Sequence, residues 1–196
     1  VAGISEAELR AVEAYNRGVQ SADLEKKVAA YALAATLLPD FYEAHFNLAV
    51  AEARSGASDA ATASYRNAAA LRPEALEVKR NLGRLFLKRK AFSDAIEEFR
   101  KALDIAPDEA QSHNDLGEAF RRSGNAAEAI QHFQSSLAIN NSVPNVHFNL
   151  ALAYANSKQA AEAIRHFQAY LALYPEAPDT AEVEATIKQL QTSPGE

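Results

Sequence analysis

The chain has 196 residues, of which 48% are hydrophobic and 23% are charged, which is ordinary for a folded protein. It contains no Cys, so disulfides, thiolate metal sites and cysteine nucleophiles are excluded. The net charge of −6 argues against a general nucleic-acid binder, which is usually basic. No apolar run approaches the roughly 18 residues that a membrane-spanning helix needs.

The first expected helix begins after Ser5. Ser5 is followed three residues later by Glu8, and this pair is the signature of a capping box at a helix N-terminus. Residues 6–41 are predicted to form two helices with a shortened turn at residues 21–23. Pro39 is expected to end this pair, because proline cannot continue a helix.

A period of 34 residues governs the next part of the chain. Pro39, Pro73 and Pro107 are separated by 34 residues, and Pro175 lies twice that distance after Pro107, with Asn141 at the intermediate position. Four further columns recur at this interval: Leu48, Leu82, Leu116 and Leu150; Ala49, Gly83, Gly117 and Ala151; Ala61, Ala95, Ala129 and Ala163; and Tyr65, Phe99, Phe133 and Phe167. A fixed period of this size indicates a repeat architecture.

Each repeat is predicted to be two helices joined by a short turn, because the apolar spacing within it is helical. The small residues allow neighbouring helices to approach closely, and the aromatic residue fills the remaining space. The predicted repeats are 42–75, 76–109, 110–143 and 144–177. Residues 6–41 form a degenerate fifth repeat, in which Asn16-Arg17-Gly18 lies about three residues too close to Tyr31.

A final helix is expected after the last repeat. Pro178 and Asp179 open it, and Val183, Ile187 and Leu190 are spaced as one apolar stripe. Terminal repeats need a polar outer face, so residues 178–191 are predicted to form a capping helix. Residues 192–196 are expected to be disordered.

This pattern resembles the tetratricopeptide repeat (TPR) family. The resemblance rests on Asn81-Leu82-Gly83 with Phe86, on Ala95-Ile96 with Phe99, and on the matching residues one period later. It implies an all-α fold, a right-handed superhelical solenoid of antiparallel helix pairs, as a single domain over residues 1–196. It also implies a protein-interaction scaffold or adaptor whose first helices line a concave groove that holds an extended peptide or a partner's helix.

The candidate groove residues follow from the repeat. Asn47, Asn81 and Asn149 each precede a columnar Leu, and an Asn amide can both donate to and accept from a peptide backbone. The alternative is that each Asn bonds only within its own repeat. The other candidates lie one residue earlier or about one turn later: Phe46, Arg54, Arg80, Arg84, Lys88, Arg121, Arg122 and Phe148.

The middle of this predicted groove is basic. Residues 72–101 contain nine Lys or Arg and five Asp or Glu, in a protein that is negative overall. Because Arg pairs well with carboxylates, this contrast favours an acidic ligand. The alternative is a solvated charged face with no ligand.

No catalytic, metal or cofactor site is predicted. There is no glycine-rich phosphate loop. His45, His113 and His147 share one repeat column, where the family often has Trp, and His132 and His166 share another. Same-column residues on adjacent repeats lie about 9–10 Å apart, given helix packing distances. That is too far for two imidazoles to share a zinc ion.

The expected partner is another protein or peptide, without nucleic acid or direct membrane insertion. Three alternatives stay open: a structural solenoid that self-associates into a homo-oligomer, the adaptor part of a larger multidomain protein, and an RNA-binding solenoid. The last is disfavoured by the negative charge. Because the chain begins at Val1, any targeting segment is expected to lie outside it, and the sequence indicates no compartment.

Overall fold

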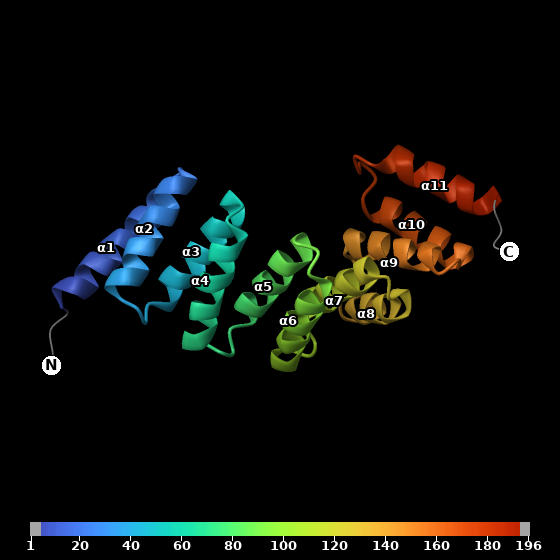
Figure 1. Ribbon diagram of the computed structural model, residues 1–196. Helices are drawn as coiled ribbons and strands as arrows, with labels where there is room; N and C mark the ends of the chain where they lie inside the picture. Colours follow the sequence, from blue (N-terminus) through green and yellow to red (C-terminus); the bar gives the residue numbers. More distant parts are fainter. Residues whose placement is uncertain (1–4, 193–196) are drawn as a thin grey trace. The chain divides into compact units, whose positions relative to one another are not determined.

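The computed structural model describes residues 5–192, which fold into eleven α-helices and no strand (Figure 1). The predicted all-α repeat architecture is therefore confirmed. The first helices of the pairs are α1 (Glu6–Gln20), α3 (Tyr42–Ser55), α5 (Leu76–Lys88), α7 (Ala110–Ser123) and α9 (Pro144–Asn156). The second helices are α2 (Leu24–Leu37), α4 (Ser58–Leu71), α6 (Phe92–Ile105), α8 (Ala126–Ile139) and α10 (Ala160–Leu173), and α11 (Thr180–Thr192) follows alone.

The chain divides into two compact units, residues 1–85 and 86–196, with the boundary inside α5. The single domain over residues 1–196 and its repeat boundaries stay predictions. Of the segment expected to be disordered, Thr192 is the last residue of α11, and residues 193–196 lie outside the described residues. Among residues 5–192, no helix combines the length and apolarity needed to cross a membrane.

In the first unit, α1 packs on α2, α2 on α3, and α3 on α4. The capping box is present: the Glu8 amide donates to the Ser5 hydroxyl over 3.2 Å, and the Ser5 amide donates to the Glu8 carboxylate over 2.6 Å. The predicted shortening lies at the C-terminal end of α1 and not in the turn. When Asn16 is matched to Asn47, α1 ends at the position of Ala51, whereas α3 continues to Ser55.

In the second unit, the predicted columns form the core. Phe99, Phe133 and Phe167 are almost completely buried, as are the Ala residues four positions before each of them. Gly117 lies so close to Phe133 that an added Cβ would be 2.8 Å from its ring. The small residues therefore admit the aromatic rings, as the repeat predicts.

The capping helix α11 packs on α10 through the predicted stripe. Val183 is buried, and Ile187 and Leu190 are partly buried against the same core. The Tyr170 hydroxyl donates to Asp179 over 2.7 Å and fixes the approach to the helix. This hydrogen bond raises the pKa of Tyr170 to about 12.

The turns between paired helices share one backbone feature. Gly56 and Gly124 have φ angles of 87° and 91°, and Lys90 and Lys158 have φ angles of 61° and 57°. These four residues lie 34 positions apart and end the first helices in the left-handed region, which favours glycine. Two of the four repeats therefore place a strained lysine at this position.

Candidate peptide-binding surface

The predicted site residues lie on the first helices of both units. Phe46, Asn47 and Arg54 are on α3, Arg80, Asn81, Arg84 and Lys88 are on α5, Arg121 and Arg122 are on α7, and Phe148 and Asn149 are on α9. Residues up to Leu85 belong to the first unit and the others to the second. Each unit therefore carries part of the predicted surface.

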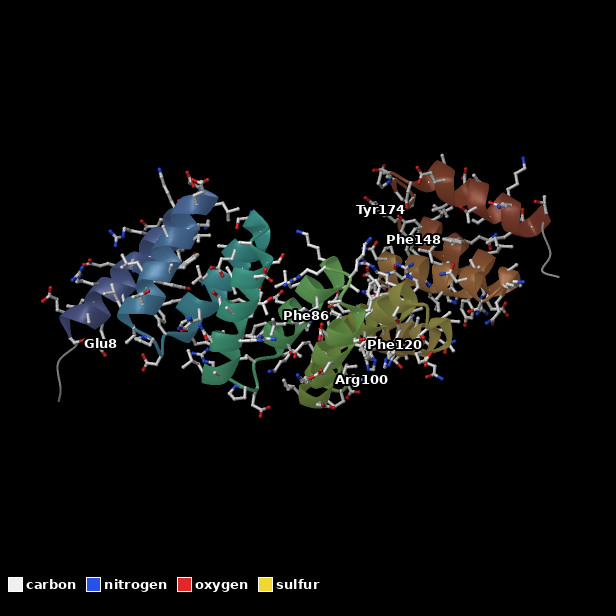
Figure 2. The ribbon with its side chains drawn as sticks, viewed as in Figure 1. Glu8, Phe86, Arg100, Phe120, Phe148 and Tyr174 are labelled. Atoms are coloured by element: carbon white, nitrogen blue, oxygen red, sulfur yellow. The ribbon has the colours of Figure 1, made fainter. Side chains whose placement is uncertain are left out.

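The two predicted aromatic residues are partly used in packing. Phe46 is half-buried, with its ring centre 6.0 Å from those of Tyr42 and Tyr65. Phe148, labelled in Figure 2, is half-buried against Phe167 and Tyr170, at ring-centre distances of 5.8 and 5.2 Å. Part of each aromatic surface is therefore used in packing and is not available to a ligand.

The three asparagines differ from one another. The Asn47 side-chain amide donates to the Tyr15 hydroxyl over 2.8 Å, which ties α3 to α1. This bond gives Asn47 a structural contact between two helix pairs, whereas the alternative to binding was a bond within its own repeat. Asn81 and Asn149 are half-buried, and their side chains form no hydrogen bond within residues 5–192. Their role in binding stays a prediction.

The predicted basic residues range from exposed to half-buried. Arg54, Arg84 and Lys88 are exposed, whereas Arg80, Arg121 and Arg122 are half-buried. Burial lowers the pKa of Arg121, and nearby Glu118 opposes this effect. The Arg122 guanidinium lies 3.5 Å from the Glu118 carboxylate and 5.7 Å from the centre of the Phe92 ring.

The basic stretch 72–101 is partly neutralised by its own neighbours. Arg72 forms an ion pair of 2.7 Å with Glu43 and lies 4.0 Å above the Tyr42 ring. Lys101 forms ion pairs of 2.7 Å with Glu97 and Glu98, which raise its pKa. Because Glu43 lies outside the stretch, its ion pair with Arg72 lowers the positive excess below the sequence count, which already includes Glu97 and Glu98.

An exposed apolar stripe on α1 was missed by the sequence analysis. Leu9, Val12 and Val19 have exposed fractions of 51%, 45% and 53%. Matching Asn16 to Asn47 places Val19 at the position of Val50, on the groove side of a first helix. That match is the sequence signal for the stripe, which the degenerate spacing of residues 6–41 obscures.

The histidines form two pairs that the sequence analysis also missed. His113 on α7 and His132 on α8 approach with their Nδ1 atoms 3.1 Å apart, and His147 on α9 and His166 on α10 do so at 3.0 Å. In each pair, the distance between the ring centres exceeds the distance between the two Nδ1 atoms by about the sum of the two ring radii. Both nitrogens therefore lie on the line between the rings, which is the geometry of a direct N–H···N hydrogen bond.

The remaining contacts of each pair fix its protons. His113 Nε2 lies 2.9 Å from the Pro107 carbonyl oxygen, which can only accept. His113 therefore carries its proton on Nε2 and accepts at Nδ1 from His132. His147 has the same arrangement, with Nε2 3.2 Å from the Asn141 carbonyl oxygen. His45 also bonds a carbonyl oxygen, that of Pro39, but Ser64 stands where α8 and α10 have His.

The second histidine of each pair is held in its neutral form. Burial, and then the partner His, lower the pKa of His132, and the same two causes lower that of His166 to about 4. His132 stacks on Phe120 at 5.6 Å, and His166 stacks on Tyr154 at 5.7 Å. In the part of the chain that the structure describes, no group of three or more His, Asp or Glu side chains is arranged to hold a metal ion.

Comparison with protein families settles the identity of the repeats. Models described as "Tetratricopeptide repeat" match residues 54–110 and 144–177, and one described as "TPR repeat" matches residues 117–158. Together these matches span more than half of the chain. The chain belongs to the tetratricopeptide repeat family. A comparison with curated proteins finds no match.

Solved TPR structures share the fold of this chain. MamA 41-end from Desulfovibrio magneticus RS-1 is 17% identical, with a TM-score of 0.81 over 90% of this chain and 99% of that one. PilF of Pseudomonas aeruginosa is 18% identical, with a TM-score of 0.76 over 97% and 89%. YrrB, described as a TPR protein with an unusual peptide-binding site, is 15% identical, with a TM-score of 0.71 over 83% and 84%.

At these identities the likeness concerns the fold alone. TPR proteins are generally scaffolds for protein interaction and are typically non-catalytic.

Proposed function

We propose that this chain is a non-catalytic adaptor that binds an extended peptide or a partner's helix along its first helices, and that the ligand is acidic. One observation carries the proposal. Arg54, Lys88 and Arg122 lie 34 residues apart, each in the last turn of a first helix. The repeat thus places a cation at the same position of three successive first helices.

Part of this pattern has a structural cause. A cation in the last turn of a helix interacts favourably with the negative end of the helix dipole. Any exposed cation in the last turn makes this interaction with the helix dipole. In α9 the interaction is absent, because its last turn has no basic residue. Arg54 and Lys88 are exposed, so their charge is available to a ligand as well.

In the first unit, the apolar stripe on α1 adds a second chemistry. Leu9, Val12 and Val19 are exposed on α1, while Arg54 is exposed at the end of α3. Exposed apolar side chains and an exposed cation in the same unit suit a ligand with both apolar and acidic residues. Lone-peptide affinities near micromolar, about −8 kcal/mol, are expected for such a surface.

The test is a selection of peptides on the intact chain, followed by calorimetry. Peptides from a random library displayed on phage should be enriched in Asp and Glu together with apolar residues. Arg54→Glu combined with Lys88→Glu should weaken binding of a selected peptide by about tenfold or more, because attraction becomes repulsion. Basic or neutral selected peptides would contradict the proposal.

A matched control separates this effect from net charge. Arg66 on α4 and Arg165 on α10 are exposed on second helices, and reversing both gives the same change in charge. This control variant should bind the selected peptide as the wild type does. Equal weakening in both variants would mean that the first-helix cations have no specific role.

A further inference from the structure

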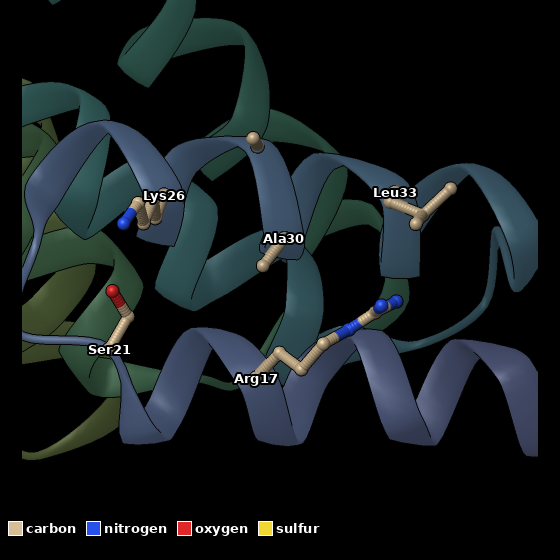
Figure 3. Close-up of a pocket in the computed structure, with 6 residues that line it drawn as sticks. Arg17, Ser21, Lys26, Ala30 and Leu33 are labelled. Carbon is tan, nitrogen blue, oxygen red and sulfur yellow. The ribbon is translucent and has the colours of Figure 1, made fainter.

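A cleft lies between the first two helices, outside the predicted groove residues. It is lined by Arg17 on α1, by Ser21 in the turn, and by residues 26, 29, 30 and 33 of α2, with a volume of about 370 Å³ (Figure 3). Lys26 and Arg17 supply positive charge, and Ala29, Ala30 and Leu33 form an apolar wall. A volume above about 300 Å³ is within the range of ligand sites.

The next helix pair shows what usually covers this position. Matching Asn16 to Asn47 places Arg17 at the position of Leu48. Leu48 is buried against Tyr31 of the preceding pair, whereas Arg17 is exposed and Leu33 has an exposed fraction of 41%. The first-helix position that α2 covers in the second pair is therefore cationic and open in the first pair. Ala29 and Leu33 on the α2 side of the cleft are exposed, as are the matching residues Ala63 and Asn67 of α4.

The two cations of the cleft have no acidic partner of their own. Within residues 5–192, neither Arg17 nor Lys26 forms a side-chain ion pair or hydrogen bond. Lys27 beside them differs, because its ammonium donates to the Gly18 carbonyl oxygen over 3.2 Å. The cleft thus offers unpaired positive charge next to an apolar surface.

The opposite end of the chain has the complementary chemistry. Residues 174–187 contain Glu176, Asp179, Glu182 and Glu184 and no Lys or Arg. Glu182 and Glu184 are exposed on α11, and Ala181 and Ala185 are exposed beside them. They lie away from the stripe of Val183, Ile187 and Leu190, which packs on α10. The outer side of α11 therefore carries two carboxylates beside small side chains that permit close approach of another helix, and it also carries exposed Lys188 one turn after Glu184.

We infer that the cleft receives α11 of a second copy of this chain, so that copies associate head to tail. Glu182 and Glu184 of one copy pair with Arg17 and Lys26 of the next, and Ala181 and Ala185 pack on Ala29, Ala30 and Leu33. Such a contact joins two different surfaces and leaves one free at each end, so it can extend to a third copy. The inference does not depend on the proposed function, because it does not use Arg54, Lys88 or Arg122.

The test is sedimentation equilibrium of the intact chain over a range of concentrations. The mean mass should rise with concentration at about 50 mM salt and fall at about 500 mM salt, because exposed ion pairs are screened. Arg17→Glu with Lys26→Glu should raise the dissociation constant by at least about tenfold, and so should Glu182→Lys with Glu184→Lys. A wild type that stays monomeric at low salt would overturn the inference.

Mixing the two variants makes the test specific to the named surfaces. In an equimolar mixture, the acidic cleft of the Arg17→Glu, Lys26→Glu variant can bind the basic α11 of the Glu182→Lys, Glu184→Lys variant. The α11 of the first variant and the cleft of the second are unchanged, so they can bind each other as in the wild type. Association should therefore return to the wild-type level. The double reversal of Arg66 and Arg165 to Glu is the control and should associate as the wild type does. No recovery in the mixture, or association in either single variant equal to that of the wild type, would mean that another surface is responsible.

Discussion

Fully buried aromatic rings set the distance between paired helices. Phe133 on α8 has no exposed surface, and it lies against the backbone of α7 at Gly117. Phe167 is equally buried one repeat later, where Ala151 takes the place of Gly117. At the scale of single residues, stability therefore depends on whether a methyl group fits under the ring.

Gly117→Ala tests this dependence. An added Cβ would lie 2.8 Å from two carbons of the Phe133 ring, and the ring has no free space into which it could move. Overpacking costs about 1–3 kcal/mol, while the higher helix propensity of Ala returns about 1 kcal/mol. We expect a net loss of about 1 kcal/mol in the free energy of unfolding, measured by urea denaturation. Ala151→Gly is the reciprocal control, and a more stable Gly117→Ala variant would contradict this account.

Single-residue contacts are also where prediction from the sequence was weakest. The period identified which residues share a column, and it thereby found the core rings and the first-helix surface. It did not indicate that Asn47 bonds Tyr15 or that His113 meets His132, because these contacts join different columns. A column fixes a residue's place on its helix, whereas a contact also depends on how two helices are set against each other.

At the scale of helices, the ends of the first helices are the least uniform part of the repeat. Four residues at one repeat position adopt positive φ angles, and two of them are lysines. The sequence predicted a short turn between the two helices of each repeat. It did not predict that the lysines adopt the same backbone conformation as the glycines, because a lysine does not signal that conformation.

Lys158→Gly should stabilise the second unit. A non-glycine residue in the left-handed region costs about 1–2 kcal/mol, and Gly loses about 0.5–1 kcal/mol through its flexibility in the unfolded chain. The expected gain is about 0.5–1 kcal/mol in the free energy of unfolding, seen as a higher urea midpoint. Gly124→Ala is the opposite change at the same repeat position, and nothing crowds its Cβ within 4 Å, so it should destabilise through the backbone alone. A loss of stability in Lys158→Gly would argue against backbone strain at this turn.

At the scale of the whole molecule, the two units carry different titrating groups. The second unit has both histidine pairs, and the first has a single His without a histidine partner. The first unit instead has Glu52 where the second has Phe120 and Tyr154. Burial raises the pKa of Glu52, although its hydrogen bond from Ser64 opposes this effect. Acidification should therefore affect the two units in opposite directions.

The sign follows from proton uptake. His132 and His166 have lowered pKa values when folded, so the unfolded chain takes up protons first as the pH falls below about 6.5. The stability of the second unit is complete above that pH and is lost towards about pH 4. Arg100, which faces His132, and Arg165, which faces His166, add to the loss, while Glu162 reduces it. A raised carboxyl pKa acts the other way, so Glu52 makes the first unit relatively more stable as the pH falls.

Between pH 7 and pH 5 we expect the second unit to lose about 1–2 kcal/mol, after allowance for the partial exposure of both rings. Hydrogen exchange of the native protein, corrected for intrinsic rates, should show a selective loss of protection in α8 and α10 and none in α2 and α4. His132→Gln combined with His166→Gln removes both titrating rings and should abolish the selective loss. If protection falls equally in both units, or survives in the second unit at pH 5, the histidine pairs do not control its stability.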